Sequence, residues 1–119
     1  MKMMRFVFLT LLISISCNAL AAKLEYRLIP EKIAEDTWLL QGAVQDFTRE
    51  NGGNIVNTAF IVTEEGVVVL DTGPSKRYGE ALRAAIRSVT DKPIIHVFNS
   101  HHHPDHFLGN AEFSHTKII

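Results

Sequence analysis

Residues 101–106 read His-His-His-Pro-Asp-His and follow the apolar run at residues 94–98, so four good metal ligands fall within six positions. In an extended segment alternate side chains share one side, so His101 and His103 are predicted to point together. Pro104 then forces a turn, which brings the last two residues of the run beside them. Two imidazoles for one ion, and a carboxylate with an imidazole for a neighbouring ion, suit zinc and less often iron or manganese. A solvated His-rich tract is the alternative, but such a tract needs neither Pro nor Asp at these places.

The spacing His-x-His-x-Asp-His, with Asp71-Thr72-Gly73 upstream, resembles the metallo-β-lactamase superfamily of metallohydrolases. The resemblance runs from about Thr37 to Ile119. It implies an α/β fold, the αββα sandwich, of which this chain would form only the N-terminal half. Because the chain stops within a predicted strand, we expect a truncated piece of a longer enzyme.

The resemblance also implies a ligand set. It assigns His101 and His103 to a first Zn²⁺ ion, and Asp105 and His106 to a second. A catalytic zinc normally has three protein ligands and an open position, so the remaining ligands are expected beyond Ile119. Asp105 is the expected catalytic residue, which ligates and steers a metal-bound hydroxide. The hydroxide would attack an ester-, thioester-, lactone- or lactam-like small molecule, whose binding residues stay unassigned.

Asp71 ends an apolar strand, where a buried carboxylate is costly unless it has partners. The resemblance implies that Asp71 accepts a hydrogen bond from a metal-binding imidazole and so orients the ring. The alternative is a turn-forming Asp that local backbone amides satisfy. His115 is a candidate extra ligand, but the short helix predicted before it should carry it away from the metals. His96, inside a strand, is expected to be structural.

The His directly after Asp105 favours a likeness to thioesterases, lactonases and Cys-free β-lactamases over Cys-using ones. An iron-dependent persulfide dioxygenase branch shares the motif and stays open. Residues 57–63 and 71–82, with the N-terminal segment, also resemble exported metallohydrolases associated with bacterial quinoprotein systems. Phe47 and Trp38 are candidates for lining a pocket, although Trp38 suits the core equally well. Two other interpretations remain: a non-catalytic remnant, and an exported metal-binding module.

The first 21 residues have the composition of a signal peptide. Lys2 and Arg5 give a basic start, residues 6–15 are almost wholly apolar, and Ala19-Leu20-Ala21 has the small-x-small form of a cleavage site. The apolar core is short for a membrane span. We therefore predict a signal peptide over residues 1–21 and export, for example to the bacterial periplasm.

The mature part would be residues 22–119, enough for one small domain or part of one. Cleavage removes Cys17, the only cysteine, so neither a disulfide nor a Cys ligand is expected there. The chain carries 12 basic and 13 acidic residues without a basic block, which makes nucleic acid an unexpected partner. The oligomeric state is left open.

Hydrophobic patterns predict alternating strands and helices. One strand is apolar almost throughout, which predicts burial on both of its faces. The turn before it holds Gly66, predicted to need positive φ. The predicted elements are strands at 24–29, 37–42, 54–63, 67–71, 94–99 and from 116, a loop at 45–54, a helix capped by Ser75 and running to Val89, and a short helix after Asp105.

Overall fold

The computed structural model describes residues 23–119. The predicted signal peptide, its cleavage site and Cys17 lie outside these residues. None of the helices within 23–119 is long and apolar enough to span a bilayer.

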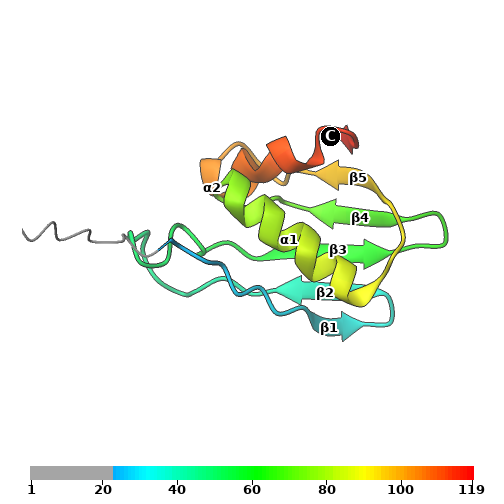
Figure 1. Ribbon diagram of the computed structural model, residues 1–119, viewed down its shortest axis with the longest axis horizontal. Helices are drawn as coiled ribbons and strands as arrows, with labels where there is room; N and C mark the ends of the chain where they lie inside the picture. Colours follow the sequence, from blue (N-terminus) through cyan, green and yellow to red (C-terminus); the bar gives the residue numbers. More distant parts are fainter. Residues whose placement is uncertain (1–22) are drawn as a thin grey trace, which may run out of the picture.

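The described residues form a mixed sheet in which the strands lie side by side in chain order, as Figure 1 shows. Strands β1 to β4 are antiparallel neighbours, whereas β4, β5 and β6 run parallel. The parallel pairs are joined through helices, as parallel connections require. The elements are β1 Glu31–Ala34, β2 Thr37–Leu40, β3 Thr58–Val62, β4 Val67–Leu70, α1 Lys76–Val89, β5 Ile94–Phe98, α2 Pro104–Phe107, the 3₁₀ helix η1 Leu108–Phe113, and β6 Lys117–Ile118.

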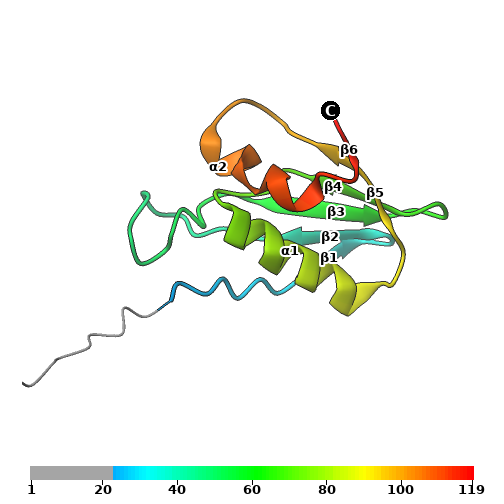
Figure 2. The same cartoon turned by 45° about the horizontal axis from the view of Figure 1, so that its top comes forward.

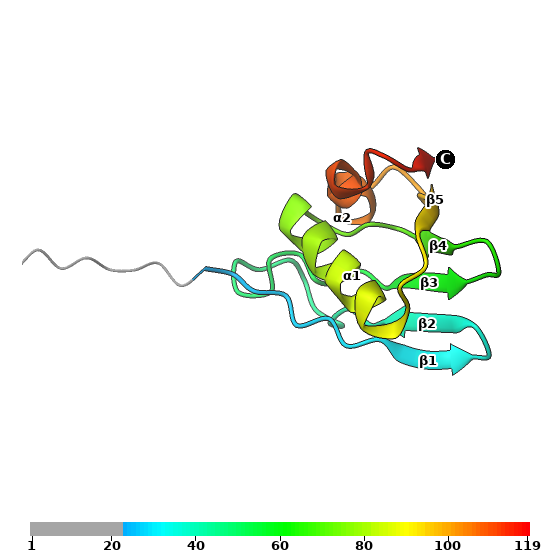
Figure 3. The same cartoon turned by 45° about the vertical axis from the view of Figure 1, so that its right-hand side comes forward.

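Helix α1 packs across one face of the sheet, with η1 beside it (Figures 1, 2 and 3). The Ser75 side chain accepts a hydrogen bond from the Tyr78 amide, so the predicted cap is confirmed, as is the predicted end of the helix at Val89. The apolar side of α1 meets the sheet in a buried cluster that Phe113 of η1 completes. The core residues are Leu40, Val56, Phe60, Val67, Val69, Tyr78, Leu82, Ala85, Ile86, Val97 and Phe113.

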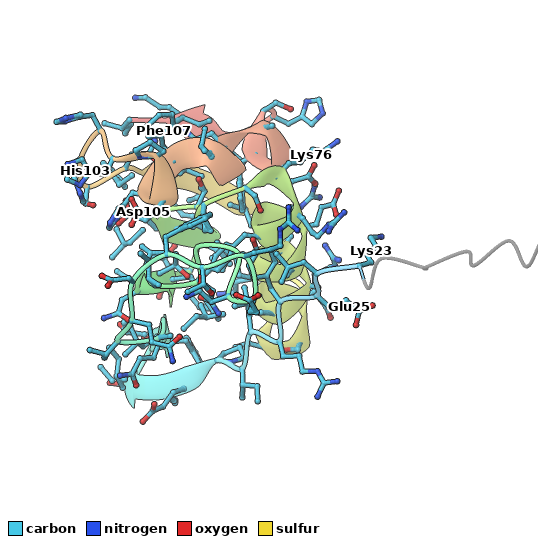
Figure 4. The ribbon with its side chains drawn as sticks, turned by 90° about the vertical axis from the view of Figure 1, so that its left-hand side faces the viewer. Lys23, Glu25, Lys76, His103, Asp105 and Phe107 are labelled. Carbon is cyan, nitrogen blue, oxygen red and sulfur yellow. The ribbon has the colours of Figure 1, made fainter. Side chains whose placement is uncertain are left out.

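The prediction that β4 is buried on both faces is wrong for the described residues. Val67 and Val69 face the helices and are fully buried, but Leu70 is 38% exposed and its neighbour Phe98 on β5 is 39% exposed. Figure 4, viewed from the end of the sheet, shows α1 on one side of it. The sheet therefore has one covered face and, within residues 23–119, one partly exposed apolar face.

The strand predicted at residues 24–29 is also wrong. This segment pairs with no strand, although its alternate residues are partly buried. The Tyr26 hydroxyl donates to the Gly52 carbonyl at 2.7 Å, and its ring contacts Tyr78 edge-on at 5.1 Å. The alternation thus reflects packing on the α1 side. The true edge strand β1 was missed because all four of its residues are exposed and give no apolar pattern.

The starts of two elements and the role of one glycine differ from the predictions. Strand β3 begins only at Thr58, since residues 54–57 do not pair in the sheet. Gly66 does not have positive φ; it is needed because a Cβ would press on the Pro93 carbonyl and the Ile95 side chain. Helix α2 begins at Pro104, because a proline in the first turn removes no intrahelical hydrogen bond.

Candidate metal centre

Two polar residues, Asp71 and Ser100, lie where β4 and β5 end. The strands are parallel, with Leu70 beside Phe98, so their carboxyl ends coincide. Asp71 follows β4, and its amide donates to the Phe98 carbonyl at 2.8 Å. Ser100 lies just beyond β5 and opens the His-rich segment. Carboxyl ends of parallel strands are where α/β proteins usually place their ligand sites.

The Asp71 carboxylate is 6% exposed and is fully engaged. Its Oδ1 accepts from the Ser100 amide at 2.7 Å, and its Oδ2 accepts from the Ser100 hydroxyl at 2.7 Å. Nδ1 of His106 lies 2.7 Å from the same Oδ2. These partners are 29 and 35 positions away, so local turn amides do not satisfy the carboxylate. Asp71 also has φ of 61°, a left-handed conformation that Asp tolerates better than most residues.

A main-chain clamp holds the two halves of the site together. The Thr72 amide donates to the His106 carbonyl at 2.8 Å, and the Gly109 amide donates to the Gly73 carbonyl at 3.1 Å. Gly73 has φ of 88°, and a Cβ there would collide with the Tyr78 ring. A Cβ on Gly109 would collide with the Thr72 carbonyl. The two glycines therefore permit the close approach that fixes His106 over Asp71.

The imidazoles of His101, His102, His103 and His106 lie close together. Figure 4 labels His103 and Asp105 at this edge of the molecule. The ring centroid of His101 lies 4.0 Å from that of His106 and 4.6 Å from that of His103. The chain bends at residues 101 and 102 instead of staying extended, yet the rings of His101 and His103 still meet. His102 is exposed, with its ring 5.2 Å from that of His103.

Within residues 23–119, no three His, Cys, Asp or Glu side chains are arranged so that they could hold one ion. A pair does fit. Nε2 of His106 lies 3.6 Å from Oδ2 of Asp105. Zinc bonds of about 2.0–2.2 Å at tetrahedral angles separate two ligand atoms by roughly 3.3–3.6 Å. Because Asp71 occupies Nδ1 of His106, Nε2 is the nitrogen left for a metal, so these residues fit zinc in donor type and spacing.

Comparison with known proteins decides the family. The family model described as the metallo-beta-lactamase superfamily matches residues 51–119, more than half of the chain. The chain belongs to the metallo-β-lactamase superfamily. The predicted fold class is thereby confirmed, with the six strands and their helices forming part of that α/β fold.

Individual relatives of the superfamily are much longer. A linear primary-alkylsulfatase from Pseudomonas sp. (strain ATCC 19151) is 38% identical over 53 residues, which cover 44% of this chain and 10% of the relative. A metallo-beta-lactamase from Pontibacter korlensis is similar in structure, with a TM-score of 0.61, 20% identity, and coverage of 77% of this chain and 42% of that one. A stereoselective inverting sec-alkylsulfatase from Pseudomonas sp. is also similar in structure, with a TM-score of 0.57 and 20% identity. The match covers 76% of this chain and 14% of that one. The chain thus spans less than half of the length of each.

An apolar cavity of about 260 Å³ opens beside Asp105. Phe47, which is one of the predicted pocket residues, lines it. Trp38 does not, because its ring stacks on Phe60 in the core at 5.4 Å. Besides Asp105, the lining consists of Phe47, Ile55, Pro74, Pro104 and Leu108.

The other sequence candidates lie elsewhere. His115 lines a different cavity, of about 290 Å³, with Arg83 and Arg87 of α1, as expected for a residue carried away from the metal motif. His96 lies in β5 opposite Val68, and its buried Nδ1 has no hydrogen-bond partner among the described residues. Sequence reasoning missed Ser100. Only its position between a strand end and the His run could have singled it out.

Proposed function

We propose that this chain is part of a metal-dependent hydrolase in which the predicted ligand pairs bind two metal ions. Zinc is the first candidate metal, and iron and manganese are the alternatives. His101 and His103 would bind one ion, and Asp105 and His106 the other. The spacing of 3.6 Å between Asp105 Oδ2 and His106 Nε2 supports this most directly. Each ion would need further protein ligands, which residues 23–119 do not supply.

The side chains of this segment would prepare the site for hydrolysis. Asp71 holds the His106 ring through Nδ1 and so keeps Nε2 turned outwards, toward Asp105. Asp105 would be the catalytic residue, because its free oxygen can accept a hydrogen bond from the attacking water and orient it. When bound, zinc lowers the pKa of a coordinated water to about 7 and so supplies a nucleophile near neutral pH.

The substrate we favour is an ester-like small molecule with an apolar group next to the bond that is cleaved. Apart from Asp105, the residues that line this cavity are apolar, so it would accept a hydrocarbon group next to the reacting bond. The relative with 38% identity is a linear primary-alkylsulfatase. An alkyl sulfate ester is therefore the first candidate, ahead of thioesters, lactones and lactams.

Zinc content and hydrolysis test this proposal. We would measure both on the chain without residues 1–21, and on any longer polypeptide that its reading frame encodes. The substrate panel would comprise an alkyl sulfate, a thioester, a lactone and a β-lactam. We expect bound zinc, and alkyl sulfate hydrolysis in the form that carries all ligands. If no form retains zinc above the level of an Asp105→Ala, His106→Ala double variant, the metal assignment is wrong.

A second function, an exported metal-binding module, is favoured by one observation. His101, His102 and His103 are all exposed and could bind ions from solution without a closed active site. Zinc binding with no hydrolysis of any panel substrate by any form would select this function. Export itself is proposed from residues 1–21, with residues 22–119 as the mature domain. N-terminal sequencing of the secreted protein should then begin at Ala22.

A further inference from the structure

The Ser100 hydroxyl lies at the centre of the site and belongs to neither predicted ligand pair. Its Oγ is 2.7 Å from Asp71 Oδ2, 2.9 Å from His101 Nδ1 and 3.3 Å from His106 Nδ1. The Ser100 amide separately donates to Asp71 Oδ1. One residue therefore touches the buried carboxylate and one imidazole from each predicted metal pair.

The number of available protons fixes the direction of these hydrogen bonds. A serine hydroxyl has one proton to donate and a carboxylate oxygen can only accept, so at 2.7 Å Ser100 must donate to Asp71. The Oγ then offers only lone pairs to His101. Nδ1 of His101 must therefore carry a proton, and its Nε2 keeps the free lone pair. The opposite arrangement would leave two acceptor oxygens facing each other with no proton between them.

His106 reaches the same state by a direct route. Its Nδ1 donates to Asp71 Oδ2 at 2.7 Å, which also leaves Nε2 as the free nitrogen. Nε2 is the ring nitrogen farther from the backbone, and a fixed tautomer removes one source of disorder before a metal arrives. The two rings, with centroids 4.0 Å apart, are thus prepared by the same carboxylate.

We propose that Ser100 is a positioning residue whose hydroxyl links the Asp71 carboxylate to His101 through two hydrogen bonds. One buried carboxylate would then orient an imidazole of each metal pair. This proposal rests on the proposed function for its metal-binding consequence. The tautomer of His101 is a property of the chain alone. A merely structural Ser100 would support the turn after β5 through its amide, and removing the hydroxyl would leave His101 unchanged.

The test compares Ser100→Ala, Ser100→Thr and the control Ser88→Ala. The alanine variant keeps the hydrogen bond from the main-chain amide to Asp71 but loses the hydroxyl that links Asp71 to His101. The threonine variant keeps a hydroxyl. Ser88→Ala is the control because it also removes one serine hydroxyl, which donates to the Ala85 carbonyl within α1, away from the site. Long-range ¹H–¹⁵N spectra of the imidazoles report the tautomers without metal. A zinc titration followed on the same signals reports binding at His101 and His106 separately.

We expect Ser100→Ala to lose the single Nδ1–H tautomer of His101 and to weaken zinc binding there about tenfold, the lower end for partners of metal ligands because Ser100 is exposed. Signals of His106 should change little. Ser100→Thr and Ser88→Ala should match the parent chain. An unchanged His101 tautomer and affinity in Ser100→Ala would overturn the proposed link. If no form binds zinc, including any longer polypeptide that the reading frame encodes, the proposed function fails, while the tautomer comparison still decides the role of Ser100.

Discussion

The hydroxyl groups of Tyr78 and Thr58 lie 2.9 Å apart inside the core, where α1 crosses β3. Neither side chain is exposed, so this is a polar contact within an otherwise apolar cluster. The same Tyr78 ring packs under Gly73, next to the metal-motif clamp. One tyrosine therefore links helix packing to the floor of the candidate site.

Tyr78 should make the chain sensitive to alkali. Burial raises the pKa of its phenol to about 12, while the Thr58 hydrogen bond opposes the shift. An unfolded tyrosine loses its proton near pH 10, so the folded state alone holds the proton between about pH 10 and 12. Stability should therefore fall as pH rises through this interval, and Tyr78 should contribute no pH dependence below it.

Urea unfolding at pH 8 and pH 11 measures this effect. Tyr78→Phe should lose about 1 kcal/mol at pH 8, because the Thr58 hydroxyl loses its partner. Between pH 8 and pH 11, the free energy of unfolding should fall by less in Tyr78→Phe than in the parent chain. Tyr26→Phe is the comparison variant: Tyr26 makes the smallest contribution to the raised pKa of Tyr78, so most of the parent slope should remain. An equal alkaline loss in Tyr78→Phe and the parent would remove Tyr78 as the cause.

Asp71→Asn should separate metal binding from folding. Asparagine also adopts the left-handed conformation, so the turn should persist with a modest loss of stability. The amide cannot accept the same set of hydrogen bonds, and the His106 ring loses its anionic partner. We expect zinc affinity to fall by about 10–100-fold. Isothermal titration beside Asp46→Asn, an exposed control, would show this difference; equal affinities would contradict it.

Asp105→Asn should reduce turnover far more than stability. The side chain is partly exposed and accepts no hydrogen bond from the described residues apart from its 3.6 Å approach to His106. The free energy of unfolding should therefore change by less than about 0.5 kcal/mol. Turnover is measured in the longest form that hydrolyses the panel substrate. Normal turnover by the variant would refute a catalytic role for Asp105.

Leu108→Ala tests the apolar cavity. Leu108 is half exposed and lines the cavity beside Asp105, so its loss should weaken contact with an alkyl chain and not with the reacting group. We expect KM for a long-chain alkyl ester to rise about tenfold with kcat nearly unchanged, from roughly 25 cal/mol per Å² of lost apolar contact. A short-chain ester is the control substrate. A similar rise for both chain lengths would place the alkyl group elsewhere.

Local patterns were sufficient for the elements whose signals lie in neighbouring residues. The Ser75 cap with its helical apolar spacing, and the hairpin before Asp71, were predicted nearly as the structure has them. Strand β1 was not, because an exposed edge strand has no apolar alternation. Residues 24–29 showed the opposite error, since a segment packed on a helix has the same alternation as a strand.

The candidate site was predictable in its residue types and not in its connections. The His-rich motif announces metal binding by composition and spacing within six positions. The bond from Asp71 to His106 spans 35 positions, and its geometry depends on how β4 and β5 align. Ser100 has no distinctive chemistry of its own. Its part in the network follows only from a position between two groups that the fold brings together.

The clamp from Thr72 and Gly73 to His106 and Gly109 consists of main-chain hydrogen bonds. Every substitution at Thr72 except proline keeps the amide that donates to His106, whereas a Cβ at Gly109 would collide with the Thr72 carbonyl. Changes of chain length are different. One inserted residue between Pro104 and Gly109 would displace the His106 carbonyl or the Gly109 amide from its partner. No side chain could restore these main-chain hydrogen bonds. The length of this segment is therefore a requirement of the site in addition to its glycine at position 109.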